Sequence, residues 1–89
     1  MKLMIVIVRD TDDERVIQAL VDHGYRVTRM SSTGGFLRRG NVTLLIGVEA
    51  EKVQAVFDLL QETCCPGEPA AEQHRATIFV VDMPFFKQI

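Results

Sequence analysis

The 89 residues, 47% of them hydrophobic, suffice for one small domain spanning residues 1–89. A formal net charge of −2, from 10 basic and 12 acidic side chains, gives no electrostatic footprint of a protein that binds DNA or RNA. The longest apolar run, Leu3 to Val8, is too short to span a membrane, and no signal-peptide cleavage site follows it. A cytoplasmic protein without a membrane segment is therefore expected.

Residues 3–8 form an apolar, largely β-branched run without alternation, the pattern of a strand buried on both faces. Thr11 and Glu14 then have the spacing of a capping box, which predicts that a helix begins there. Its apolar stripe pairs residues four apart, and Gly24 stands where a left-handed C-terminal cap is expected.

Residues 25–32 alternate sufficiently for a second strand, with Arg26 and Thr28 on one face. Residues 42–48 predict a third strand, interrupted by Gly47, which often marks a close approach by backbone or ligand.

The second helix is predicted from apolar residues at helical spacing, namely Val53, Val56, Phe57 and Leu60. Pro66 ends this helix, and the prolines of residues 66–75 indicate a loop. Residues 77–81 form the last strand, and a short aromatic tail follows. Phe79 is expected in the core whatever the function.

The order β-α-β-β-α-β is that of the ferredoxin-like α+β fold, a four-stranded antiparallel sheet with both helices on one face. The other face would be bare, although the strands are apolar on both sides. Soluble monomers avoid an exposed apolar patch of several hundred Å². The simplest cover is another copy of the chain in a closed ring.

The stretch from Thr33 to Asn41 contains three of the six glycines. Its paired glycines permit positive φ, Phe36 offers a flat face for a base, and Arg38 and Arg39 supply cations for an anion. This composition favours a binding loop. The alternative is a hairpin tip with an incidental phenylalanine.

Other chemistries find less support in the sequence. An RNA-binding module of this topology stacks bases on aromatic residues of its central strands, and the first and third strands contain none. An acylphosphatase-like enzyme would want a glycine-rich cradle after the first strand, where residues 9–12 read Arg-Asp-Thr-Asp. No Ser/His/Asp or Cys/His set is evident, so no enzymatic activity is expected.

Metal and disulfide chemistry are not expected either. Cys64 and Cys65 are adjacent, whereas a disulfide framework needs spaced pairs and structural zinc needs four ligands. We interpret the cysteines as reduced residues at a helix end, and His23 and His74 as surface residues.

Several strings of this chain resemble the PII-like cyclic-di-AMP receptor proteins: Tyr-Arg-Val-Thr at residues 25–28, Thr-Gly-Gly-Phe-Leu-Arg at 33–38, Gly-Asn-Val-Thr at 40–43, and the closing segments 76–80 and 86–88. The resemblance implies a non-enzymatic signalling protein without a cofactor. It implies a homotrimer of ferredoxin-like subunits that binds cyclic di-AMP in the clefts between neighbours. The matching ligand-binding positions are Arg26, Thr28, Gly35, Phe36, Leu37, Asn41, Gly47, Phe79 and Gln88.

Some of these residues have a purely structural alternative. Arg26 can be a solvated strand residue, Asn41 can shape a turn, and Gly47 can answer to subunit packing. The chain also departs from the family in the loop before the last strand, which is cut to about ten residues and has His74 and Arg75 in place of a glycine pair. Two alternatives therefore stay open: a sensor of another adenine nucleotide, and a scaffold that acts through an unidentified protein target.

Overall fold

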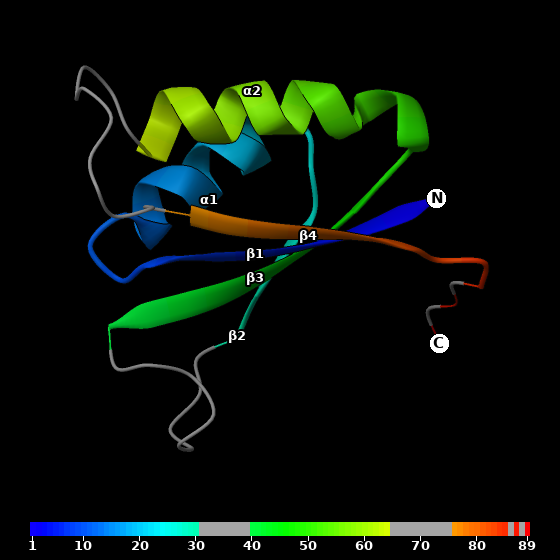
Figure 1. The fold of residues 1–89 in the computed structure, drawn as a ribbon, viewed down its shortest axis with the longest axis horizontal. Coiled ribbons are helices and arrows are strands. Elements are labelled where there is room, and N and C mark those ends of the chain that lie inside the picture. The colour runs from blue at the N-terminus through cyan, green and yellow to red at the C-terminus, as the bar shows by residue number, and fades with distance from the viewer. Residues whose placement is uncertain (31–39, 65–75, 86, 88) are drawn as a thin grey trace.

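The computed structural model describes residues 1–30, 40–64, 76–85, 87 and 89, which form a four-stranded antiparallel sheet with two helices on one face (Figure 1). The strands are β1 (Lys2–Arg9), β2 (Val27–Met30), β3 (Asn41–Val48) and β4 (Ala76–Asp82), in the spatial order β2-β3-β1-β4. The helices are α1 (Asp13–Asp22) and α2 (Val53–Cys64), the latter preceded by the 3-10 turn η1 (Ala50–Lys52). The predicted ferredoxin-like α+β fold is confirmed. The predicted loop 66–75 lies outside the described residues.

The core forms where alternate residues of the central strands β1 and β3 face the helices. Val6 lies opposite Leu44 in the antiparallel register, and both side chains are fully buried. Helix α1 contributes Val16 and Leu20 to this layer. The buried apolar residues are Met4, Val6, Val8, Val16, Leu20, Val42, Leu44, Ile46, Val48, Val56 and Leu60.

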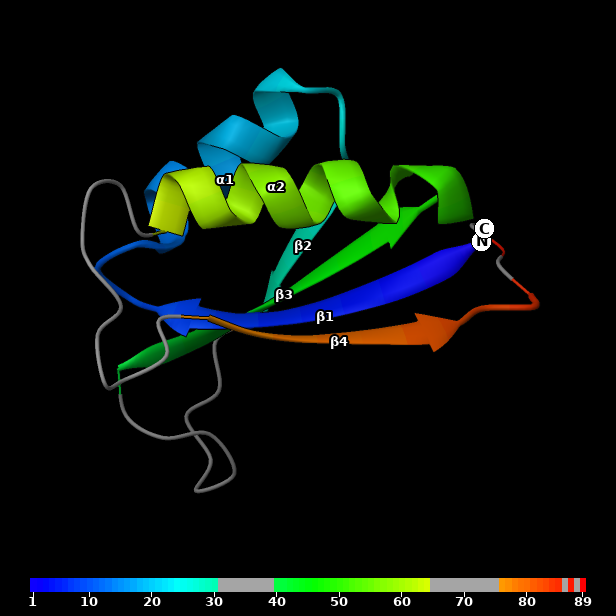
Figure 2. The ribbon, with the colours of Figure 1, turned by 45° about the horizontal axis from the view of Figure 1, so that its top comes forward.

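The other residues of the same strands form an apolar face that we call the open face. Both helices lie on one side of the sheet, and neither covers this second side (Figure 2). At its centre Ile5 lies opposite Leu45 on one neighbour and Phe79 on the other. Met30 and Val81 belong to this face as well and are about half exposed, at 49% and 47%. The central strands are thus apolar on both faces, and among the described residues no helix covers the open face.

Phe79 is not in the core, contrary to the prediction. Its side chain is 52% exposed. The apolar run of β4 does not reveal which residues point toward the helices, and the register with Ile5 places Phe79 on the open face.

The predicted capping box at the start of α1 is wrong. The helix begins at Asp13, and its N-cap is Asp12, whose side chain makes no capping hydrogen bond. A turn precedes the helix, closed by a hydrogen bond from the Asp12 amide to the Arg9 carbonyl oxygen at 2.9 Å. This turn moves the first helical residue beyond Thr11.

The end of α1 follows the prediction. Gly24 has a φ of +86°, the left-handed conformation that glycine adopts without steric cost. Its amide donates to the carbonyl of Val21, and the amide of Tyr25 donates to that of Leu20, each at 3.0 Å. These two bonds define a Schellman motif. Because Tyr25 belongs to the motif, β2 begins at Val27 and not at residue 25.

Replacing Leu44 tests the core. Leu44→Ala should lower the free energy of unfolding by about 2–5 kcal/mol, because a fully buried leucine leaves a cavity. The matched control is Val21→Ala, which truncates a residue that is 52% exposed. It should change the free energy of unfolding by less than about 0.5 kcal/mol. Urea unfolding at one fixed protein concentration measures both values. Equal losses in the two variants would contradict this assignment of the core.

Candidate ligand-binding site

The N-terminus, the end of β3 and the start of α2 come together at one end of the sheet (Figure 2). A pocket of about 690 Å³ lies at this end. Its floor is the end of the open face, where Leu3 of β1 lies opposite Gly47 of β3 and Leu45 lies two residues before Gly47 on the same strand. Ligand pockets commonly measure about 300–1,000 Å³. The lining residues are Met1, Leu3, His23, Gly24, Tyr25, Arg26, Thr28, Leu45, Gly47, Val48, Glu49, Lys52 and Met83.

The Schellman motif supplies one wall of the pocket. It turns the chain from α1 into β2 and brings the consecutive residues 23–26, with the side chains of His23, Tyr25 and Arg26, to the rim. His23 Nδ1 lies 2.8 Å from the carbonyl oxygen of Ala19. A carbonyl oxygen only accepts hydrogen bonds, so Nδ1 carries a hydrogen and Nε2 is left to meet solvent or a ligand.

The opposite wall comes from the connection between β3 and α2. Glu49 follows the last residue of β3, and Lys52 ends η1. The Lys52 amide donates to the Glu49 carbonyl oxygen at 2.9 Å, which fixes this turn. The rim thus carries the cations Arg26 and Lys52 and one carboxylate.

This arrangement suits a ligand with a flat apolar part and an anionic part. The apolar floor favours burial of a ring, and the absence of a side chain at Gly47 lets the ring approach the backbone of β3. Arg26 and Lys52 at the rim can form charge-assisted hydrogen bonds to phosphate or carboxylate oxygens.

The nine predicted ligand-binding residues fall into three groups. Arg26, Thr28 and Gly47 come together in the pocket. Asn41 and Phe79 do not line it: Asn41 begins β3, about 20 Å from Gly47 along an extended strand, and Phe79 lies at mid-strand on the open face. The predictions for Gly35, Phe36, Leu37 and Gln88 fall on residues outside those that the structure describes.

The sequence reasoning missed four polar or aromatic residues of the pocket, His23, Tyr25, Glu49 and Lys52. A signal existed for the first two. Gly24 predicted a helix end at this point, and a Schellman motif fixes the direction in which the next residues leave the helix. Glu49 and Lys52 carried no such signal, because only the folded chain brings η1 opposite the end of α1.

Among the described residues, no group of three or more His, Cys, Asp or Glu side chains is arranged to hold a metal ion. None of the helices among these residues is long and apolar enough to cross a membrane.

Residues 1–71 match the family model of the cyclic-di-AMP receptor, which covers most of the chain and the whole pocket except Met83. The chain belongs to the cyclic-di-AMP receptor family. This family is one of binding proteins, and the predicted resemblance is confirmed. Phe79 and Gln88 lie beyond the matched residues, so their assignment rests on the resemblance of the closing segments alone.

A solved structure supports the fold over the full length. A functionally unknown protein from Pediococcus pentosaceus ATCC 25745 is 32% identical to this chain, with a TM-score of 0.78. The match covers 99% of this chain and 96% of that one, so the two proteins have similar lengths. The fold shared with that protein therefore includes β4, which lies beyond the part that the family model covers.

An exposed ion pair lies at the pocket end of the sheet. Lys2 lies opposite Asp82 in the register of β1 and β4, and the Lys2 ammonium donates a hydrogen bond to the Asp82 carboxylate. Just beyond, the Met83 amide donates to the Met1 carbonyl oxygen at 3.0 Å, and both methionines line the pocket.

The hydrogen bond from Lys2 and its charge hold the pKa of Asp82 below its ordinary value of 3.8. A lowered pKa stabilises the fold above the ordinary value, and this contribution is lost as the pH falls through the folded-state pKa. An NMR titration of the Asp82 carboxyl group should show the low pKa, and Lys2→Gln should return it to the ordinary range. An unchanged pKa in Lys2→Gln would contradict the pairing.

Proposed function

We propose that this receptor-family chain is a signal-transduction protein that binds cyclic di-AMP in the described pocket. The observation that carries the proposal is that Arg26, Thr28 and Gly47 line one pocket, within residues that match the cyclic-di-AMP receptor model. Cyclic di-AMP combines flat adenine rings with phosphates, the two features that suit the apolar floor and the cationic rim. In this proposal the protein binds the nucleotide without catalysing a reaction, and it does so in the cytoplasm.

Each pocket residue has a distinct role in this proposal. Arg26 donates charge-assisted hydrogen bonds to a phosphate or stacks on an adenine, and the Thr28 hydroxyl donates or accepts one hydrogen bond. Gly47 leaves space for the ligand against β3. The backbone amides of residues 35–37 complete the site as an anion-binding nest, a role inferred from the sequence alone.

The open face supports a homotrimer. Ile5, Leu45 and Phe79 form its centre, and together with Leu3, Ile7, Met30 and Val81 they make an apolar surface of the kind that soluble monomers avoid. Three copies around a closed axis cover three such faces at once. Because the pocket floor is the end of this face, the trimer would place each pocket between two subunits.

Gly47 provides a test of the pocket in two steps. A Cβ at this position would lie 3.7 Å from Met83 Cε, an ordinary contact, so Gly47→Ala should fold, and its single methyl group should weaken binding less than valine does. Gly47→Val adds two methyl groups to the floor and should weaken binding of cyclic di-AMP by about 1–3 kcal/mol. Calorimetry on the wild type and both variants measures this difference.

The outcomes separate the candidate functions. If the wild type and Gly47→Val bind cyclic di-AMP with equal affinity, the ligand binds outside this pocket. Binding of ATP or another adenine nucleotide in preference to cyclic di-AMP would identify a sensor of a different ligand. No heat with any of these nucleotides would leave a scaffold that acts through a protein target.

The trimer is tested by light scattering at micromolar concentration. The wild type should have about three times the 10.0 kDa mass of one chain. Ile5→Asp should abolish this assembly, because a carboxylate at the centre of a buried apolar face is left without a partner. Val21→Asp introduces the same charge at an exposed apolar site on α1 and should remain trimeric. A wild-type monomer, or a trimer that tolerates Ile5→Asp, would refute the proposed interface.

A further inference from the structure

The edge strand β2 carries a pocket residue on one face and an ion pair on the other. Thr28 lies opposite Leu45 on the open-face side and lines the pocket. The next residue, Arg29, lies opposite Leu44 and therefore points toward the helices. Among the described strands β2 pairs with β3 alone, so contacts with α1 decide how firmly this four-residue strand is held.

The contact with α1 is an ion pair on a buried carboxylate. Arg29 Nε donates to Asp13 Oδ2 at 2.7 Å. The Asp13 side chain is only 4% exposed, whereas that of Arg29 is 50% exposed. Asp13 is the first residue of α1, where the helix dipole favours a negative charge. The helix thus fixes the Asp13 carboxylate, and Arg29 binds β2 to it.

The turn that precedes α1 also contacts the chain just before β3. The amide of Asp10 donates to the carbonyl oxygen of Gly40 at 2.7 Å, one residue before β3 begins at Asn41. Gly40 has a φ of +92°, which a residue with a side chain rarely adopts. Residues 10–13 therefore contact the chain at the end of β2 and again just before β3.

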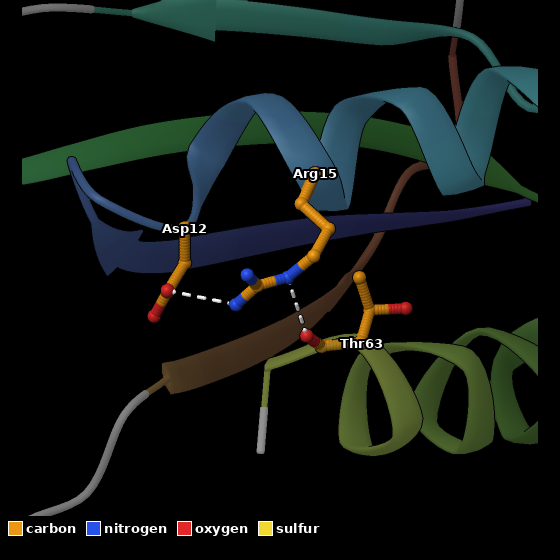
Figure 3. A network of polar contacts seen from close by, with 3 residues as sticks. All are labelled: Asp12, Arg15 and Thr63. Carbon is orange, nitrogen blue, oxygen red and sulfur yellow. Dashed lines mark hydrogen bonds and ion pairs between the residues drawn. The ribbon is translucent and has the colours of Figure 1, made fainter. Parts of the chain in front are cut away.

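A second ion pair involves the neighbouring Asp12 and connects to α2 instead of β2. Asp12 Oδ1 accepts a hydrogen bond from Arg15 Nη2 at 2.9 Å, and Arg15 Nε donates to the carbonyl oxygen of Thr63 at 3.0 Å, near the end of α2 (Figure 3). This pair has nearly the same exposures, 51% for the Arg15 side chain and 6% for that of Asp12. It joins α1 to α2 and makes no described contact with β2.

We propose that Asp13 and Arg29 are positioning residues for the pocket, which fix β2 on α1 so that Thr28 faces the ligand. This inference rests on the proposed function, because the positioning matters only if the pocket binds the nucleotide. Neither residue lines the pocket. Their effect on affinity arises through the orientation of the strand, not through contact with the ligand.

The matched control for this pair is Arg15. Arg29→Gln and Asp13→Asn should each weaken cyclic di-AMP binding by about threefold to thirtyfold, the range for residues that act on a site without touching the ligand. Arg15→Gln removes the equivalent ion pair toward α2 and should change affinity by less than about twofold while it still lowers thermal stability. Calorimetry and thermal unfolding of the full chain give both readouts.

Two further variants test that the residues act as one contact. The double variant Asp13→Asn/Arg29→Gln should bind no more weakly than whichever single variant has the lower affinity. The first substitution already breaks the ion pair, so the second has no further interaction to remove. Arg29→Lys retains the cation beside Asp13 and should recover most of the affinity. Equal affinities in Arg29→Gln and Arg15→Gln, or additive losses in the double variant, would overturn the proposal.

Hydrogen exchange separates this proposal from the proposed function. Without ligand, the amides of residues 28–30 should exchange faster in Arg29→Gln than in the wild type, and Arg15→Gln should leave them unchanged. If the wild type does not bind cyclic di-AMP, the proposed function fails and this exchange pattern alone decides whether the pair holds β2. Unchanged exchange in Arg29→Gln would refute the positioning role whether or not the nucleotide binds.

Discussion

Two helices can cover only one face of the four-stranded sheet, yet its central strands are apolar on both. Met4, Val6 and Val8 are completely or almost completely buried beneath the helices, whereas Leu3, Ile5 and Ile7 alternate with them on the open face. Burial of apolar surface is the dominant favourable term in folding and association. The same alternation that builds the core therefore provides the surface on which the proposed assembly and the floor of the pocket both depend.

The second organising feature is α1, both of whose ends contact or lead into β2. At its C-terminal end the Schellman motif around Gly24 sends the chain into the strand and leaves His23 and Tyr25 at the pocket. At its N-terminal end Asp13 holds Arg29 of the same strand. An edge strand with one β partner gains from such contacts, because its own ladder fixes it on a single side.

The pocket combines an apolar floor with a charged rim, and it belongs to a chain of the cyclic-di-AMP receptor family. The floor comes from strands whose register is fixed by the core. The rim comes from connections, the α1–β2 turn and η1, where charged side chains are free of the packing constraints of the sheet. This division is common in proteins, since connections carry functional side chains on a rigid scaffold.

The sequence alone determined the order of elements, the ferredoxin-like topology and the family. Periodicity reports which residues can share a face, and Gly24 marks a helix end through its backbone conformation, so these features are local. Three residues that line the pocket, Arg26, Thr28 and Gly47, were also predicted from the resemblance of local strings to the family. Only the tertiary structure decided which of two apolar faces the helices cover, and hence that Phe79 lies outside the core. It also decided that Lys52 and His23 line the same pocket and that Asp13 pairs with Arg29. Both arrangements involve residues far apart in sequence, which strand register and helix packing bring together and no local pattern encodes.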